Sequence, residues 1–97
     1  MKKIKIYQIQ FIGDCSYSFM SWDFAKDKFN INDYTLVAEY EEEDYKDNFL
    51  LNEIWEKGNN GELQCQFPNM YSISVSNIIE IDNKKYYVDS FGFKEVE

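Results

Sequence analysis

Few residues in this sequence are of the types that do chemistry. Asp89 and Ser90 stand side by side near the end of the chain, and a carboxylate beside a hydroxyl could serve as base and nucleophile. The sequence contains no histidine, the usual base in such sites. Side chains of Asp and Ser more often bond the backbone of a turn, which is the use we expect for this pair. We therefore expect no catalytic residues and no enzyme. An enzyme that uses Asp89 and Ser90 remains the alternative from a different function class.

The sequence also contains no pattern typical of a cofactor or metal site. Cys15 and Cys65 form no C-x-x-C pair, and without histidine no mixed zinc site can be completed. The acidic stretch 39–47 lacks the central glycine and the regular spacing of a calcium loop. The glycines of 58–61 follow an expected helix, whereas a phosphate-binding loop would open one. We expect no cofactor, no metal and two reduced, buried thiols, and whether they pair is left open.

Charge limits the partners more sharply. The 97-residue chain carries 18 acidic residues against 10 basic ones, all of them lysine, and its formal net charge is −8. Such a surface repels phosphate backbones and anionic membranes, so we expect no direct nucleic-acid or membrane partner. It favours a host protein with a basic surface, although the acids could simply keep the protein soluble. Without a signal peptide or membrane span in the sequence, we expect the cytoplasm of a bacterial host.

The densest charge block is the candidate binding site. It passes from the end of an expected strand into the start of a helix, and alternate acids should share one strand face about 6.6–6.8 Å apart. That spacing resembles a row of phosphates and could occupy a basic nucleic-acid channel. The alternative is that the last acids favour a helix N-terminus and the others aid solubility. The acids of this run are Glu39, Glu41, Glu42, Glu43, Asp44 and Asp47.

Aromatic residues offer a second candidate surface. Exposed Tyr and Trp side chains commonly anchor protein interfaces. Tyr40 and Tyr45 stand within the acidic run, so we add them to the candidate site. The tyrosines and one tryptophan exceed what we expect so small a core to hide, and they could equally form a homodimer seam, so monomer and homodimer both remain open. These residues are Tyr7, Tyr17, Tyr34, Tyr40, Tyr45, Tyr71 and Trp22.

The elements that would position these residues follow from periodicity. Apolar and polar residues alternate in segments that predict strands, whereas apolar residues at helical spacing predict a short helix and one of about 12 residues, which Asp44 or Asp47 could cap. We expect residues 1–97 to form one α+β domain, a small antiparallel sheet of about four to five strands with two helices packed on it. We predict strands at 3–11, 34–41, 78–81, 85–88 and 91–94, helices at 22–29 and about 45–57, a loop at 62–69, and a possible helical turn within 72–77.

The C-terminal third contains two distinctive segments, Ser-Ile-Ser-Val-Ser-Asn at 72–77 and Tyr-Tyr-Val-Asp-Ser-Phe-Gly-Phe at 86–93. These segments resemble the signature of the YodL-like domain family, and Lys-Ile-Tyr-Gln-Ile at 5–9 is a looser match. One departure is Asn77, where the family usually carries Asp. The resemblance implies a compact α+β module of prophages and other mobile elements, without established catalytic residues.

These observations together favour a binding protein. We expect a non-enzymatic inhibitor or modulator, encoded by a phage or mobile element, that occludes a basic surface on a host protein such as a defence nuclease of the CRISPR or restriction type. The acidic run would supply steering and mimicry, and Tyr40 and Tyr45 would supply contact. A modulator of another host system, such as the cytoskeleton or cell envelope, remains the alternative among binding proteins.

Overall fold

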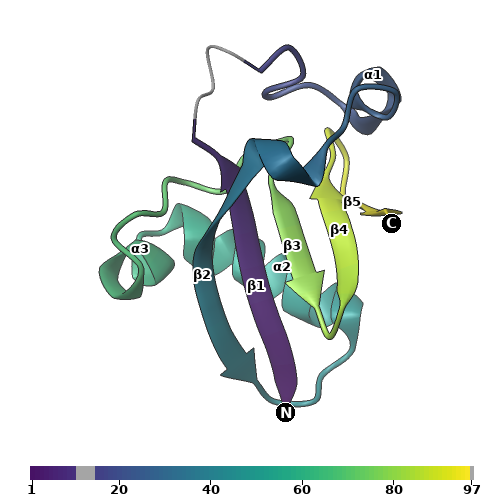
Figure 1. The fold of residues 1–97 in the computed structure, drawn as a ribbon. Coiled ribbons are helices and arrows are strands. Elements are labelled where there is room, and N and C mark those ends of the chain that lie inside the picture. The colour runs from purple at the N-terminus through teal and green to yellow at the C-terminus, as the bar shows by residue number, and fades with distance from the viewer. Residues whose placement is uncertain (11–14, 97) are drawn as a thin grey trace.

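The protein is described by a computed structural model that covers residues 1–10 and 15–96 (Figure 1). Within these residues a five-stranded antiparallel sheet is combined with three α-helices and one short 3₁₀ helix, which confirms the predicted α+β class. The part of the first predicted strand beyond residue 10 lies outside the described residues. The elements are β1 (Lys2–Ile9), α1 (Trp22–Ala25), η2 (Ile31–Asp33), β2 (Tyr34–Glu42), α2 (Asp47–Asn59), α3 (Glu62–Gln66), β3 (Ile78–Ile81), β4 (Lys84–Val88) and β5 (Phe93–Val96).

β1 is an inner strand of the sheet and lies between β2 and β3. The strand order is β2-β1-β3-β4-β5, so β2 and β5 form the two edges. β3 and β4, two of the predicted strands, form a hairpin, and the two residues of its turn, Asp82 and Asn83, have φ angles of 47° and 72°. Short polar residues such as these tolerate the left-handed backbone that a two-residue hairpin turn requires. The chain ends with β5 on the far side of β4 (Figure 1).

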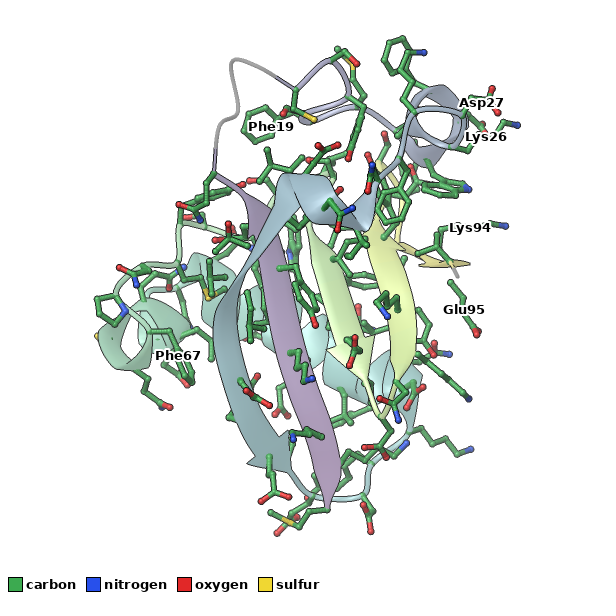
Figure 2. The ribbon with its side chains drawn as sticks, viewed as in Figure 1. Phe19, Lys26, Asp27, Phe67, Lys94 and Glu95 are labelled. Atoms are coloured by element: carbon green, nitrogen blue, oxygen red, sulfur yellow. The ribbon has the colours of Figure 1, made fainter. Side chains whose placement is uncertain are left out.

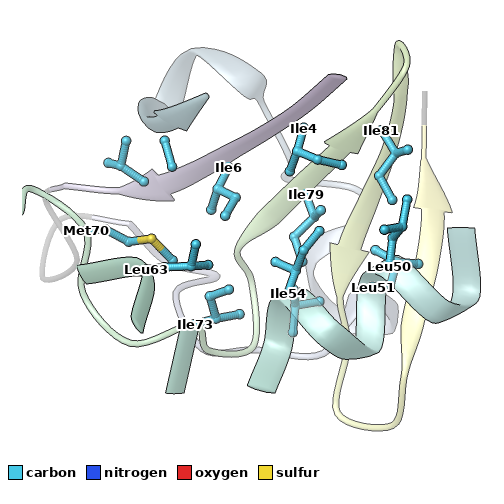
Figure 3. Close-up of a cluster of buried hydrophobic side chains, with 13 residues drawn as sticks. Ile4, Ile6, Leu50, Leu51, Ile54, Leu63, Met70, Ile73, Ile79 and Ile81 are labelled. Carbon is cyan, nitrogen blue, oxygen red and sulfur yellow. The ribbon is translucent and has the colours of Figure 1, made fainter. Parts of the chain in front are cut away.

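One face of the sheet packs on α2 and α3. Alternate residues of the strands point toward α2, including Ile4 and Ile6 of β1 and Ile79 of β3 (Figure 3). The helix meets them with Leu50 and Ile54, which are at most 2% exposed. The apolar residues at helical spacing that predicted this helix also include Tyr45, Phe49 and Trp55, but these three are 44%, 51% and 40% exposed, so the prediction of one buried apolar stripe is wrong for them. The buried stripe consists of Leu50, Leu51, Ile54 and Gly58.

The other face of the sheet carries a second core at the end where α1 lies. Tyr17 and Tyr87 are buried there, and Trp22 and Phe29 pack with Tyr87 at ring-centroid distances of 5.0 and 6.3 Å. Tyr17 donates a hydrogen bond to Asp33 at 2.7 Å. The prediction of a surplus of exposed tyrosines is therefore wrong for Tyr17, because this second core buries it.

Three local predictions differ from the structure. The first helix ends at Ala25 instead of 29, although Phe29 N still donates to Ala25 O at 2.7 Å. The predicted loop at 62–69 begins with α3, which starts after Gly61 in the left-handed region and buries Leu63. Neither Cys15 nor Cys65 is buried or paired, which corrects the expectation of buried thiols.

A buried polar network ties β1 to the segment before β3. Asn77 is fully buried, and its Oδ1 accepts hydrogen bonds from Ser74 N at 2.9 Å and Gln8 Nε2 at 3.1 Å. Gln8 also exchanges two hydrogen bonds with the backbone of Tyr71. The segment 72–77 forms an irregular turn with Ser76 at a φ angle of 86°, so no helical turn forms there.

Candidate protein-binding surface

The acidic run divides between two faces of the molecule. On the face of the sheet that α2 does not cover, Glu39 lies 3.3 Å from Lys3 Nζ. Glu41 stands opposite Lys3 in the β1–β2 register and is exposed. Asp44 is exposed and pairs with the N-terminal ammonium at 3.1 Å. The predicted row of three acids on one strand face is thus shortened, because β2 ends at Glu42, before Glu43.

Asp47 is held inside the structure and serves folding. Its Oδ1 lies 2.8 Å from Lys2 Nζ, and its Oδ2 accepts a hydrogen bond of 2.6 Å from the Tyr86 hydroxyl. Burial alone would raise the pKa of the Asp47 carboxyl, but the hydrogen bonds from Lys2 and Tyr86 outweigh it and lower that pKa below its ordinary value. The predicted cap by Asp44 or Asp47 is wrong, because Lys46 occupies the N-cap of α2 and Asp47 is its first residue.

This geometry predicts a pH-dependent contribution from Asp47. A carboxyl whose pKa falls on folding stabilises the protein at pH values above its pKa in the unfolded chain, about 3.9 for Asp. This contribution is lost as the pH falls through the pKa of the folded state. We expect Asp47→Asn to lower the free energy of unfolding by about 1–2 kcal/mol at pH 7, as for hydrogen bonds to a charged group. Urea unfolding at pH 7 and pH 3 measures this, and the difference from wild type should shrink at pH 3.

Asp44→Asn is the matched control for this prediction. It removes an acid three residues away whose ion pair is exposed, with the carboxylate side chain 71% accessible. Exposed ion pairs contribute little, so we expect a change below about 0.5 kcal/mol at either pH. An Asp47→Asn effect that is equally large at pH 3 would show that packing, and not the charge, is what the substitution disturbs.

The remaining acids of the run join carboxylates of α2 and α3. Lys57 lies at the centre of this group, with its Nζ 3.0 Å from Glu53 and 3.8 Å from Glu42. A shallow groove of about 200 Å³ is lined by Glu53, Glu56, Lys57, Asn60 and Glu62. The two remaining acids of the run and the three carboxylates that line the groove carry five negative charges against one ammonium, which leaves a net charge of −4. We call this surface the acidic face and define it as Glu42, Glu43, Glu53, Glu56 and Glu62.

Acidic neighbours also shape the titration of this surface. A hydrogen bond with Glu53, joined by the charges of Glu53, Glu42 and Glu62, raises the pKa of Lys57 against the opposing effect of burial. The Tyr45 hydroxyl donates to Glu43 at 2.7 Å, and this bond with the nearby carboxylates raises the pKa of Tyr45. The acidic face therefore has a strongly negative potential, and both Lys57 and Tyr45 stay protonated at neutral pH.

Aromatic rings lie beside the acidic face. Tyr45 and Phe49 pack at a centroid distance of 4.9 Å, and they are 44% and 51% exposed. Tyr40 instead stacks on Phe67 at 5.7 Å, next to α3 (Figure 2). Its hydroxyl is buried without a hydrogen-bond partner among the described residues. Of the two predicted aromatic contacts, the structure thus exposes Tyr45 and covers most of Tyr40.

Glu53, Glu56 and Glu62 of the acidic face, and Phe49 beside it, were not predicted from the sequence. Glu53 and Glu56 are three residues apart, a spacing that places both on one side of a helix. Glu62 follows after the turn that ends α2. The available signal was therefore the helical spacing of these acids, but their meeting with Glu42 and Glu43 depends on how α2 packs beside the end of β2.

Asp89 and Ser90 occupy a structural position. The Asp89 carboxylate accepts hydrogen bonds from the backbone N–H groups of Trp22 at 3.1 Å and Ser90 at 2.8 Å. It thus binds the first turn of α1, where Ser21 occupies the N-cap without a side-chain capping bond. Both residues line a groove of about 190 Å³ beside α2, whose other walls include Trp55 and Phe93.

Two negative findings concern residues 1–10 and 15–96. No group of three or more Asp, Glu and Cys side chains in these residues is arranged to hold a metal ion. No helix among them is long and apolar enough to cross a membrane.

Comparisons with known proteins place the chain in a group. A family model of the YodL-like domain matches residues 3–97. An uncharacterized protein of Acanthamoeba polyphaga mimivirus is 33% identical over 111 residues, which cover 99% of this chain and 94% of the viral protein. No solved structure matches the chain significantly.

Proposed function

Because the chain belongs to the YodL-like domain family, we propose that it is a non-enzymatic inhibitor or modulator, encoded by a phage or other mobile element, that binds a basic surface on a host protein. The target class that we propose is a host-defence nuclease of the CRISPR or restriction type, whose nucleic-acid channel the protein would occlude. The observation that carries the proposal is the acidic face, which combines a net charge of −4 with the exposed ring pair of Tyr45 and Phe49. Such a surface steers a basic partner and offers apolar contact once it has docked.

Two further observations support this proposal. The similar protein from Acanthamoeba polyphaga mimivirus is encoded by a virus, which suits a protein that acts on a host. The Asp89 carboxylate is engaged by two backbone N–H groups, so it is a poor candidate for a general base. The second observation favours a binding protein over an enzyme.

The test is an affinity pull-down from a host lysate at low and at high salt, with mass spectrometry of the retained proteins. The variant is the triple substitution Glu43→Gln, Glu56→Gln and Glu62→Gln, which neutralises three exposed acids of the acidic face. We expect it to weaken capture of a basic, nucleic-acid-binding partner about tenfold at low salt, and less at high salt. Added salt shortens the distance beyond which exposed charges are screened, from about 10 Å at 0.1 M to about 3 Å at 1 M.

The matched control is Asp23→Asn, Asp27→Asn and Glu95→Gln, which makes the same change in net charge at exposed positions outside the acidic face. Asp27 lies beside α1 and Glu95 on β5 (Figure 2). We expect this control to retain the partner. If both triple variants lose the partner equally, the effect comes from the net charge of the protein and not from the acidic face. A partner that is retained at high salt and has no basic surface would refute the proposed mode of binding.

A further inference from the structure

Charges alternate in a row across the sheet face opposite α2, on the part of that face outside the second core. In the strand register Lys85 of β4 stands opposite Glu80 of β3, Glu80 opposite Lys5 of β1, and Lys5 opposite Glu39 of β2. Glu80 is 6% exposed and lies 3.3 Å from Lys85 Nζ and 3.9 Å from Lys5 Nζ. A parallel row sets Lys3 opposite Glu41. Both rows end in a carboxylate on β2, the edge of the sheet.

The outer edge of β2 pairs with no other described strand. β2 pairs with β1 alone among the described strands, and it is nine residues long, whereas the other edge strand, β5, has four. Ile6 of β1 pairs with Ala38 of β2, but the next residue, Tyr7, pairs with Leu36, so β2 has one extra residue, a bulge, at this point. Beyond the bulge, Ala38–Glu42 is the regularly paired part of β2. No helix or strand lies beyond this lower half of β2 in Figure 1. Alternate backbone N–H and C=O groups of such an edge point away from the sheet and are free to pair.

We infer that the β2 edge accepts an extended segment of the partner protein as a sixth strand, and that this segment carries Lys or Arg at two alternating positions. Opposite charges on directly opposed residues stabilise a strand pair, and like charges destabilise it. The segment would therefore place its cations opposite Glu39 and Glu41. The alternation of positive and negative side chains across the sheet would then extend from β2 to the added strand. The inference rests on the proposed function for the basic character of the partner, and it adds how that partner binds.

The same charges disfavour a second copy of this chain as the occupant. An antiparallel pairing of two β2 strands centred on Tyr40 sets Glu39 of one copy opposite Glu41 of the other. Centring it on Glu39 or on Glu41 sets that acid opposite itself. Each arrangement brings like charges face to face in an edge pair, which is a common device against self-association. A basic segment meets the same carboxylates favourably, so the edge selects by charge.

A synthetic peptide tests the inference on the full-length protein. The probe is a nine-residue peptide, acetylated and amidated, that alternates lysine with threonine. We expect it to shift the backbone amide NMR signals of Ala38–Glu42 and to slow the hydrogen exchange of the amides that face outward. A matched peptide with every backbone amide N-methylated keeps the charge but cannot donate hydrogen bonds, and we expect it to bind at least about tenfold more weakly. A peptide with glutamate in place of lysine should not bind.

Paired charge variants complete the design. Glu39→Lys with Glu41→Lys should weaken binding of the lysine peptide about tenfold, whereas Asp23→Lys with Asp27→Lys, which makes the same charge change near α1, should leave it within about twofold. The dispersion of the amide signals reports whether each variant folds. Equal affinity of the N-methylated peptide, or shifts confined to the acidic face, would overturn the inference. Concentration-dependent protection of β2 without any peptide would overturn it in favour of a second copy.

Failure of this inference is distinguishable from failure of the proposed function. If the pull-down retains a basic partner that leaves the Ala38–Glu42 amides unprotected, the function stands and the strand addition is wrong. If the lysine peptide adds to β2 but no basic partner is captured, the binding mode stands and the proposed function is wrong.

Discussion

Replacing Asn77 with Ala should lower the free energy of unfolding by about 3 kcal/mol, which corresponds to a fall in Tm of roughly 15 °C for a domain of this size. The Asn77 side chain is fully buried, and its Oδ1 accepts from Ser74 N and Gln8 Nε2 at 2.9 and 3.1 Å. Alanine leaves the buried N–H of Ser74 without this acceptor and opens a small cavity. An unsatisfied buried donor costs about 1–3 kcal/mol, and the lost packing adds to that cost.

Urea and thermal unfolding of two companion variants separate the causes. Asn77→Asp keeps the acceptor oxygen, so it should lose less stability than Asn77→Ala. Ser74→Ala is the control within the same turn, because the Ser74 hydroxyl bonds the exposed carbonyl of Ser72. We expect Ser74→Ala to change stability by less than about 0.5 kcal/mol. A loss below about 1 kcal/mol for Asn77→Ala would mean that water or a shifted backbone satisfies the Ser74 N–H.

The segments that resemble the family signature serve the fold in this structure. Ser76 Oγ accepts from the Phe19 N–H at 3.1 Å, Asp89 binds the N-terminus of α1, and the Tyr87 hydroxyl donates to Met20 O at 2.6 Å. All three bonds anchor residues 19–22 to the end of the sheet. The motif therefore accounts for the fold in this structure, and the two surfaces that we propose for partner binding, the acidic face and the β2 edge, lie outside it.

The strands were predictable because their signals are local. Alternation in β1 and β2 and the polar residues between β3 and β4 depend only on neighbours in sequence. Apolar residues occur at both even and odd positions of β1, and Ile4 and Ile9 accordingly lie in different cores. By contrast, α3 is five residues long and buries one leucine, too little to produce a periodic pattern.

The candidate site was less predictable because its charges are set by tertiary contacts. The run from Glu39 to Asp47 is uniform in sequence, yet Lys2 holds the Asp47 carboxylate within the structure, whereas Lys3 pairs with a Glu39 carboxylate that stays partly exposed; both lysines come from β1, at least 36 residues away in sequence. Only packing decides which acids stay available. Phe49 shows the same limit, since the helix was correctly predicted but the face on which this ring lies was not.

Gly58 is the position where a side chain should be tolerated least. It lies in the last turn of α2, where it packs directly on Ile73, and a Cβ at this position would come within 2.4 Å of Ile73 Cδ1 and 2.6 Å of Cγ1. Ile73 is 1% exposed and belongs to the core between α2 and the sheet (Figure 3). Helix propensity alone would favour Gly58→Ala by about 1 kcal/mol, so the clash and the propensity predict opposite signs.

We expect the clash to dominate, because overpacking a dense core costs typically about 1–3 kcal/mol. Gly58→Val should lower the free energy of unfolding by about 3 kcal/mol, and Gly58→Ala by a smaller amount of the same sign. Asn59→Ala, exposed in the same turn, is the control and should change stability little. Denaturant unfolding measures all three variants. If Gly58→Ala instead stabilises the protein, Ile73 can move aside. Adding Ile73→Val to Gly58→Val should then recover little stability. If the clash is real, the double variant should regain a clear part of the unfolding free energy that Gly58→Val loses.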